Sequence, residues 1–385
     1  MSEVRRGPLT GIKVVELAGM GPGPYGAMLL ADLGADVVRV DRAGASPPDS
    51  PEKELLGRGR RSITVDLKSA AGAALVRRLA AVADALIDPF RPGVAERLGI
   101  GPEECTAANP RLVYARMTGF GQSGPLAEHA GHDINYVALA GALAHIGRRN
   151  APPVPPLNLV GDMGGGGLML AFGVAAALVE RGTSGRGQVL DVAMVDGVAS
   201  LMTMLYGYLQ QGIVTEDRGA NVFDSGSHFY EVYECSDGRY VAIGAIEPHF
   251  FRNLVEAIGL DPSSLPRRGD RSRWEESKEI LAGAFRARTR DEWCELLADQ
   301  PDLCFSPVLT MSEAPHHPHL RSRETFLDID GVVHPAPAPR FERTTGAVRH
   351  TTTVPGEHTE EVLDDWLGAG TGDVAAPGSD DALGS

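Results

Sequence analysis

The sequence has few cysteines, a deficit of basic charge and no long unbroken apolar run. Its 385 residues include four cysteines and no CxxC pair, so neither a disulfide framework nor a cysteine zinc site is indicated. The 36 Lys and Arg residues against 51 Asp and Glu give a net charge of −15, which argues against a nucleic-acid partner because such proteins need a basic surface. The most apolar stretch, 163–179, is too short to span a bilayer, and we see no signal peptide. We therefore expect a cytoplasmic protein without a membrane partner.

Strand and helix patterns alternate along the first part of the chain. Apolar β-type runs occur at 12–17, 37–40, 62–67, 85–87 and 112–117, with helical patterns at 25–33 and 71–83 between them. This alternation predicts an α/β fold with a mostly parallel, Rossmann-like sheet. Residues 168–212 read as buried helix behind a glycine-rich turn at 164–167.

The character of the chain changes after about residue 220. Residues 231–234 and 240–244 flank Ser-Asp-Gly and predict a hairpin, and helical patterns follow near 249–258 and 273–298. We therefore expect a large domain over 1–212 and a smaller α+β domain over 213–330. An extended return segment over 331–368 contains a short helix at 359–367, and 369–385 reads as a disordered tail.

The first loop, Gly21-Pro22-Gly23-Pro24-Tyr25-Gly26, matches the GxGxxG pattern of dinucleotide-binding turns, and Asp41 ends the next strand. A pyrophosphate loop acts through backbone N–H groups, which Pro22 and Pro24 lack. The prolines therefore favour a tight strand-to-helix turn over a dinucleotide site.

Basic residues near strand ends have two interpretations. Each is ordinarily a solvated surface charge, but a group of them at one sheet edge would make a local phosphate site. The residues concerned are Arg39, Arg42, Arg58, Arg60, Arg61, Lys68 and Arg91.

Two further segments carry groups suited to proton transfer. His132 precedes Asp133 at the start of a helical run, and it is either a base that works near neutral pH or a hydrogen-bonded loop residue beside a helix cap. Asp162 is a lone carboxylate in an apolar, glycine-rich setting, which favours a raised pKa, or else it is a helix N-cap. The histidines at 316, 317 and 319 lack metal-ligand spacing and read as a surface loop.

With these residues in view, the chain resembles the α-methylacyl-CoA racemases of the family III CoA-transferase superfamily over about residues 8–365. The resemblance is carried by VVELAGMGPGPYGAMLLADLGADVVRVDR, GRGRRSITVDLK, PRLVYARMTGFGQSGP, AGHDINYVALAG, PPLNLVGDMGGGGLM, DGRYVAIGAIEPHFF and APAPRF. It implies that the first turn shapes a CoA site. It also implies an interlocked homodimer whose large domain is completed by C-terminal residues.

The resemblance further implies an acyl-CoA substrate and a set of site residues. His132 and Asp162 match the two bases, and Glu247 matches a third acid that comes from the partner subunit's small domain. The positions that match CoA contacts are Arg42, Val65, Asp66, Leu67, Lys68, Arg91, Gly131, Asp133, Ile134, Asn135 and Tyr136. Neither a metal nor an organic cofactor is expected, because the thioester itself acidifies the proton that is moved.

The chemistry of the residues agrees with this implication. Inverting a carbon beside a thioester carbonyl needs one base on each face, with donors ready for the enolate oxygen, and N–H groups near Asp133 are candidate donors. The alternatives are a CoA-transferase in which Asp162 is the nucleophile, a non-catalytic CoA-binding protein and a dehydrogenase. The resemblance departs at 224–228, where Asp-Ser-Gly-Ser-His replaces a smaller, more rigid pattern, and we expect an effect on the acyl pocket.

Overall fold

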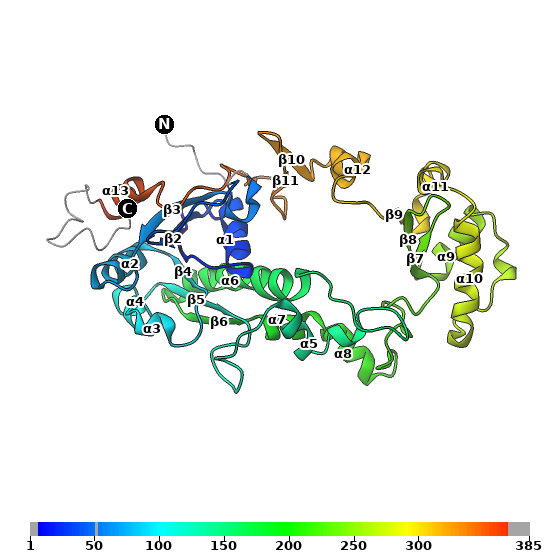
Figure 1. Cartoon of the computed structure of the whole chain (residues 1–385), viewed down its shortest axis with the longest axis horizontal. Coiled ribbons are helices and arrows are strands. Elements are labelled where there is room, and N and C mark those ends of the chain that lie inside the picture. The colour runs from blue at the N-terminus through cyan, green and yellow to red at the C-terminus, as the bar shows by residue number, and fades with distance from the viewer. Residues whose placement is uncertain (1–6, 51–52, 369–385) are drawn as a thin grey trace. The chain divides into compact units, whose positions relative to one another are not determined.

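A computed structural model describes residues 7–50 and 53–368, which form two compact units (Figure 1). The large unit contains the described residues up to 140, then 157–201 and 322–368. The small unit contains 141–156 and 202–321. The chain thus changes units at other positions than the sequence boundaries at 212 and 330, and the expected tail over 369–385 lies outside the described residues.

The large unit is built on a six-stranded parallel sheet in the order β3-β2-β1-β4-β5-β6. The strands are β1 (Lys13–Leu17), β2 (Asp36–Arg42), β3 (Arg60–Val65), β4 (Ala85–Asp88), β5 (Val113–Thr118) and β6 (Val189–Ala193). Every paired neighbour runs parallel, which confirms the predicted α/β class. The strand order reverses between β1 and β4, so the carboxyl ends of these two strands flank a topological switch point.

Each face of this sheet is covered by its own apolar core, because alternate strand residues point to opposite faces. Val14 packs with α1 (Pro22–Asp32) and α6 (Met169–Ser184), whereas Val15 packs with α2 (Ala70–Val82) and α13 (Thr359–Leu367). The short helices α3 (Val94–Arg97) and α4 (Pro102–Ala108) extend the second layer. Burial on both faces explains why apolar residues stand next to each other in these strands, as Val14 and Val15 do in β1 and Leu86 and Ile87 in β4, rather than alternating strictly with polar ones.

The C-terminal helix α13 is tied to the strand edge that it covers. Arg61 at the start of β3 binds Asp36 at 2.7 Å and Glu361 of α13 at 2.8 Å. The indole N–H of Trp366 donates to the same Asp36 carboxylate at 2.9 Å. The end of the described chain is therefore part of the large unit.

The predicted continuous helix over 168–212 is wrong in one part. After α6, Gly185 adopts φ +74, and Val189–Ala193 then forms β6, which pairs with β5. The stretch reads Val-Leu-Asp-Val-Ala, with β-branched residues and partial exposure typical of an edge strand. Helical structure resumes at α7 (Met194–Leu201) in the large unit and α8 (Thr203–Gln210) in the small unit.

The predicted glycine-rich turn is instead a wide helix, η4 (Leu159–Leu168), a π-helix that leads directly into α6. Its glycines permit close packing: a Cβ on Gly165 would meet the backbone of α7 at about 3 Å, and one on Gly167 would meet the Pro22 carbonyl oxygen of α1 at 2.6 Å. Together η4 and α6 make one apolar helical segment of 26 residues, long enough by length and composition to cross a membrane. That is weak evidence, because this segment packs one face on the sheet and a core helix meets the same criterion.

The small unit holds a three-stranded antiparallel sheet and four α-helices that lie wholly within its described residues. β7 (Tyr230–Glu234) and β8 (Tyr240–Gly244) confirm the predicted hairpin, and β9 (Phe305–Pro307) adds a strand that the sequence patterns did not indicate. The helices are α8, α9 (Pro248–Ala257), α10 (Trp274–Phe285) and α11 (Arg290–Leu297). Ser227 and His228, which belong to the departure at 224–228, are fully buried in this unit.

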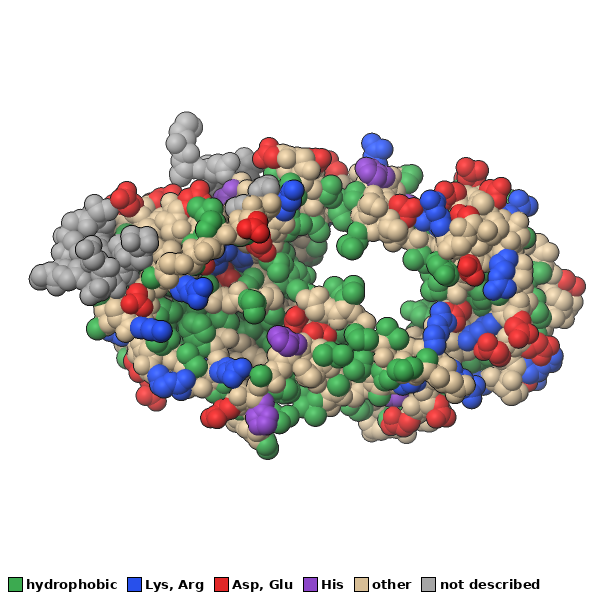
Figure 2. Space-filling view, viewed as in Figure 1, with side chains coloured by type: hydrophobic (Ala, Val, Ile, Leu, Met, Phe, Trp, Pro, Cys, Tyr) green, Lys and Arg blue, Asp and Glu red, His purple; other side chains and the backbone are tan. Residues whose placement is uncertain are grey.

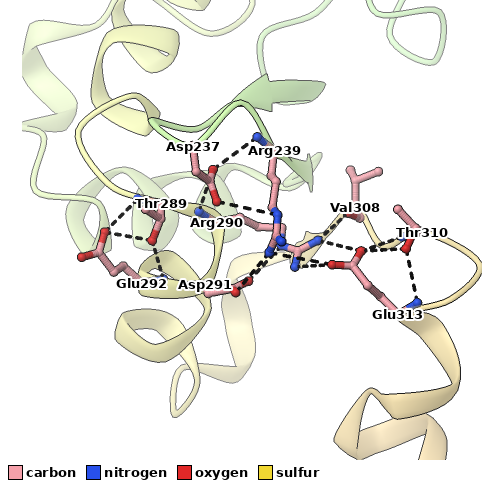
Figure 3. A network of polar contacts seen from close by, with 9 residues as sticks. All are labelled: Asp237, Arg239, Thr289, Arg290, Asp291, Glu292, Val308, Thr310 and Glu313. Carbon is pink, nitrogen blue, oxygen red and sulfur yellow. Dashed lines mark hydrogen bonds and ion pairs between the residues drawn. The ribbon is translucent and has the colours of Figure 1, made fainter.

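A polar network holds the loop after β9 against α11 (Figure 3). The guanidinium of Arg290 binds both carboxylate oxygens of Glu313, at 3.0 and 2.8 Å. Thr289 caps α11 by accepting the Glu292 N–H, and Glu292 accepts the Thr289 N–H in return. The hydrogen bonds from Arg290, with further ones from Thr310, lower the pKa of the Glu313 carboxyl to about 2.

Beyond this network the chain returns to the large unit. The expected surface loop of histidines is instead largely helical, because His316 ends a short 3-10 helix, η8 (Ala314–His316), and His319 lies in α12 (Pro318–Ser322). The chain then forms a hairpin of β10 (Phe326–Ile329) and β11 (Val332–Pro335). The Pro335 carbonyl accepts a hydrogen bond from Arg58 at 2.8 Å, and Arg58 also binds the buried Asp32 carboxylate at 2.6 Å. The return segment is thus extended, but it pairs as a hairpin.

Candidate active site

A cavity of about 440 Å³ opens at the carboxyl edge of the large unit's sheet. Its walls are the loops that follow β1, β4 and β5, together with the start of α5 (Asp133–Leu139) and one turn of η4. The cavity therefore lies at the switch point of the strand order, where open α/β sheets bind ligands. His132 and Asp162 both line it.

The turn after β1 forms one wall of the cavity. Gly21 adopts φ +65, and a Cβ at this position would lie 3.4 Å from the Asp162 carboxylate, so the turn passes directly beside the proposed base. α1 begins with Pro22 and also contains Pro24, neither of which has an N–H to offer an anion. The geometry agrees with the interpretation of this loop as a tight turn.

Asp162 sits in η4, half-buried, with its carboxylate partly shielded from water. Burial is the main cause that raises its pKa, and the nearby charge of Asp133 raises it further. A hydrogen bond from the Asn158 amide, at 3.3 Å, and the positive charge of protonated His132 act in the opposite direction. A carboxyl with a raised pKa is suited both to donate and to accept a proton near neutral pH.

His132 is the residue before the first turn of α5, and it is exposed. Its backbone N–H donates to the Asn135 side chain at 3.0 Å, which fixes the entry to the helix and leaves the imidazole at the cavity wall. Asn135 and Ile134 are exposed on the same turn. The sequence prediction of a base at position 132 beside a second base at 162 is consistent with this arrangement.

Tyr136 and Gly131 shape the floor of the cavity. The Tyr136 hydroxyl donates to the Gly131 carbonyl oxygen, and its ring packs edge-on against Phe120 with centroids 5.0 Å apart. A Cβ on Gly131 would approach the Tyr136 ring to 2.8 Å, and one on Gly119 to 2.3 Å. Burial raises the pKa of the Tyr136 phenol, and the charges of Asp162 and Asp133 add to the increase.

Asp133 differs from the expectation of a CoA contact in where its side chain lies. The carboxylate is only 6% exposed and turns away from solvent. Its Oδ2 accepts hydrogen bonds from the N–H groups of Gly161 and Asp162, at 2.6 and 2.7 Å. The side chain is therefore engaged within the protein, and only the backbone of Asp133 remains for a ligand.

The remaining predicted CoA contacts lie at the same sheet edge, because they follow the ends of parallel strands. Arg42 ends β2 and pairs in register with Val65 at the end of β3. Asp66, Leu67 and Lys68 follow, and Arg91 lines the cavity from the loop after β4. Val65 is fully buried and Leu67 packs on the core, whereas the basic side chains are exposed. Asp66 is partly exposed, and its carboxylate accepts the Lys68 N–H at 3.0 Å.

Three of the other basic residues do not belong to this edge, which corrects the idea that they converge on a phosphate. Arg58, Arg60 and Arg61 lie at the amino-terminal end of β3 and are buried. Each is paired with a carboxylate inside the large unit, at Asp32, Glu16 and Asp36 respectively. None of the three lines the cavity at the carboxyl edge of the sheet.

Sequence patterns also missed two residues beside the site. Asn158 donates to Asp162 from one helical turn earlier, a spacing that was readable once η4 was known to be helical. Asp88 ends β4 under the loop that lines the cavity and accepts the Phe90 N–H at 2.9 Å. Burial raises the pKa of Asp88 to about 6.

Glu247 belongs to the small unit and is not part of the cavity wall in the large unit. It precedes the first turn of α9, where it is exposed, and its charge acts on the guanidinium of Arg268. Among the described residues no group of three His, Cys, Asp or Glu side chains is placed to hold a metal ion.

A doubly wound parallel sheet with a cavity at its switch point, and with a histidine and a carboxyl of raised pKa on the cavity wall, defines an α/β protein equipped for acid–base chemistry on a bound ligand. The family model for "CoA-transferase family III" matches residues 9–359, and the chain belongs to this family.

Individual proteins of known name and known structure are also similar to this chain. The chain is 47% identical to α-methylacyl-CoA racemase from Mus musculus over 358 residues, which is 92% of both chains, and 46% identical to the Homo sapiens racemase over 93% of both. Among solved structures, a CaiB/BaiF family protein from Brucella suis is 28% identical with a TM-score of 0.79, over 94% of this chain and all of the other.

Proposed function

We propose that this chain is an enzyme that interconverts the (2R) and (2S) epimers of 2-methylacyl-CoA thioesters. The observation that carries the proposal is near-full-length identity of 46–47% to two α-methylacyl-CoA racemases, combined with a histidine and a carboxyl on one cavity wall. The family III model and the racemase relatives point to the same substrate class, an acyl-CoA.

His132 and Asp162 are the two bases in this proposal. His132 removes the α-proton from one epimer and leaves a planar enolate, and Asp162 delivers a proton to the opposite face. In the reverse direction the two residues exchange roles. Asp162 must be protonated to donate, and its raised pKa keeps more of it in that state.

The enolate oxygen needs donors that are in place before the proton moves. We assign these to the first-turn N–H groups of α5, which follow His132 directly. One such donor contributes about 3 kcal/mol to transition-state stabilisation in well-studied cases. No metal or organic cofactor is needed in this scheme, because the thioester carbonyl acidifies the neighbouring C–H bond.

The CoA portion supplies binding energy at a distance from the reacting carbon. We assign its anionic groups to the basic side chains at the carboxyl edge of the sheet, namely Arg42, Lys68 and Arg91, with the backbone of 65–68 and 131–136 alongside. In a chain of net charge −15 these are local cations, and substituting them should raise KM more than it lowers kcat.

The active enzyme in this proposal is an interlocked homodimer in the cytoplasm, without a membrane or nucleic-acid partner. The large unit exposes an apolar stripe on the outer side of α6, where Phe172 is 69% and Val179 is 77% exposed. Figure 2 shows further apolar side chains at the surface around α5 and α7. Exposed apolar surface of this kind is typical of a protein interface, and we assign it to the second copy. Glu247 would then reach the partner's site.

Proton exchange in D₂O tests the reaction. Each epimer of a 2-methylacyl-CoA should gain α-deuterium and converge on one epimer ratio, and His132→Ala and Asp162→Ala should abolish or strongly reduce this exchange. His316→Ala, an exposed histidine of the small unit, is the matched control. Transfer of CoA to an added carboxylic acid without exchange, with ¹⁸O passing through Asp162, would instead identify a CoA-transferase.

Coexpression tests the shared site. Chains carrying His132→Ala and chains carrying Glu247→Ala should each be impaired alone. If Glu247 acts across the dimer, a mixed dimer combines one intact site with one doubly altered site and regains up to half of the wild-type activity. Mixed dimers no more active than the two pure variants would place Glu247 within its own chain's site or outside the reaction.

A further inference from the structure

We infer that the side chain of Asp133 is a positioning residue that holds Asp162 at a fixed place relative to His132. The inference rests on the proposed function, since it concerns the geometry of the same two bases. It assigns to Asp133 a role that is distinct from ligand contact.

The clamp consists of one carboxylate oxygen and two backbone amides. Asp133 Oδ2 accepts the N–H of Gly161 at 2.6 Å and the N–H of Asp162 at 2.7 Å. These amides lie 28 and 29 residues further along the chain, on a different helix. Because Asp133 is bonded directly to His132, one side chain connects the segments that carry both bases.

The surroundings of the clamp leave it little freedom to move. Asp133 is 6% exposed, and hydrogen bonds that amide N–H groups donate to a carboxylate are strong when water is excluded. A Cβ on Gly161 would lie 2.6 Å from Asp133 Oδ2, so the close approach depends on glycine at position 161. The second oxygen, Oδ1, is buried without a hydrogen-bond partner. The hydrogen bonds that the carboxylate accepts are therefore the two from the η4 amides, both at Oδ2.

The charge of Asp133 has a second effect at the same place. The charged and titratable groups that act on Asp162 are Asp133 and His132, and Tyr136 is coupled to both carboxylates. The negative charge of Asp133 disfavours ionisation of Asp162, whereas protonated His132 favours it. Asp133 therefore sets both where the second base lies and how readily it holds its proton.

Two substitutions separate these effects. Asp133→Asn keeps an oxygen that can accept both amides but removes the charge, whereas Asp133→Ala removes the acceptor and leaves two buried N–H groups unpaired. Because a misplacement of about 1 Å costs roughly 100-fold in rate, we expect Asp133→Ala to lower kcat by about that factor with little change in KM. Asp133→Asn should keep kcat within about tenfold of wild type, with the acid limb of the kcat–pH profile displaced to lower pH.

A control variant separates the expected effect from a general loss of stability, and an NMR titration measures the Asp162 carboxyl without relying on the reaction. Asp84→Ala also removes a carboxylate that accepts a backbone N–H, that of Lys13 at 2.7 Å, but it lies at the amino-terminal edge of the sheet. It should lower stability without moving the pH profile. Carbon-13 NMR titration of the Asp162 carboxyl should show a lower pKa in Asp133→Asn than in wild type.

The possible outcomes distinguish failure of the proposed reaction from failure of the role proposed for Asp133. If wild-type protein does not exchange protons but the NMR titration shifts as expected, the proposed reaction fails and the clamp stands. If Asp133→Ala retains wild-type kcat, or if both variants raise KM equally with an unchanged Asp162 titration, Asp133 does not position Asp162 and the inference is overturned.

Discussion

Replacing Arg60 by methionine should destabilise the large unit severely, because it leaves the buried Glu16 carboxylate without its ion-pair partner. Arg60 and Glu16 are each about 1% exposed, and they meet with Arg60 Nε 3.3 Å from Glu16 Oε2. Arg60 Nη1 also donates to the Pro24 carbonyl of α1 at 2.7 Å. Removing one partner of a buried ion pair typically costs about 3–5 kcal/mol, and we expect the loss to fall in that range near pH 7.

The cost should depend on pH in a defined direction. Burial raises the pKa of Glu16 and the Arg60 charge lowers it, so loss of Arg60 raises it further. A carboxyl whose pKa is raised on folding contributes stability below its unfolded pKa and loses it as pH rises through the folded value. The destabilisation should therefore be smallest below about pH 4.5 and should grow above that, approaching about 1.4 kcal/mol per pH unit.

Urea unfolding monitored by tryptophan fluorescence measures this effect in the large unit alone. Trp366 of α13 reports the large unit, and the other two tryptophans, Trp274 and Trp293, lie in the small unit and can be replaced by phenylalanine in every variant. The matched control is the double variant Glu16→Leu, Arg60→Met, which removes both charges of this pair and should recover most of the loss. Equal stability of the single and double variants, or a pH-independent loss, would refute the reasoning.

Three further predictions concern other parts of the chain. Burial lowers the pKa of His228 to about 4, so folding stability should be lost as pH falls from about 6.5 toward 4, and thermal melts of His228→Phe should lack this dependence. The lowered pKa of Glu313 means that its contribution is present above about pH 4.5 and is lost toward pH 2, and Arg290→Ala should remove that dependence in acid-unfolding curves. Gly197→Ala would place a Cβ 1.9 Å from the Gly165 carbonyl oxygen, and calorimetry should show a loss of about 1–3 kcal/mol or more.

The parts of the fold that sequence patterns predicted are those whose signals are local. The central strands are short apolar runs bounded by turns, and the hairpin of the small unit has Ser-Asp-Gly between its strands, so their neighbours along the chain suffice. The sequence patterns did not predict β6, which lies between two helices. As an edge strand with only one strand neighbour it is partly exposed, so its residues are mixed in polarity. The π-helix η4 was not predicted because glycine normally indicates a turn. Its glycines are explained by close packing against α1 and α7, which the sequence does not show.

In the candidate site, too, features with a local sequence signal were predicted and features that depend on distant contacts were not. His132 and Asp162 were predicted from residue type and resemblance, and the structure places both at one cavity. For Arg60 and Arg61 the sequence left two interpretations open, a solvated surface charge or part of a phosphate site, and the structure shows a buried ion pair instead. A linear pattern does not say which end of a strand a residue occupies, or which distant carboxylate it meets. The clamp by Asp133 joins segments 28 residues apart, a separation that no local pattern spans.

Helix α13 also constrains how the polypeptide can be made. It packs beside α2 on the sheet face formed by β1–β3, yet it is synthesised after the entire small unit. Until residues 359–367 emerge, a ribosome-bound chain therefore leaves part of this core exposed, because α2 alone does not complete it, while the small unit's segment 202–321 is already available to fold. Non-local closure of this kind slows folding and gives chaperones a binding surface during synthesis. Premature termination before Thr359 would yield a product whose core lacks Val362, Leu363 and Trp366.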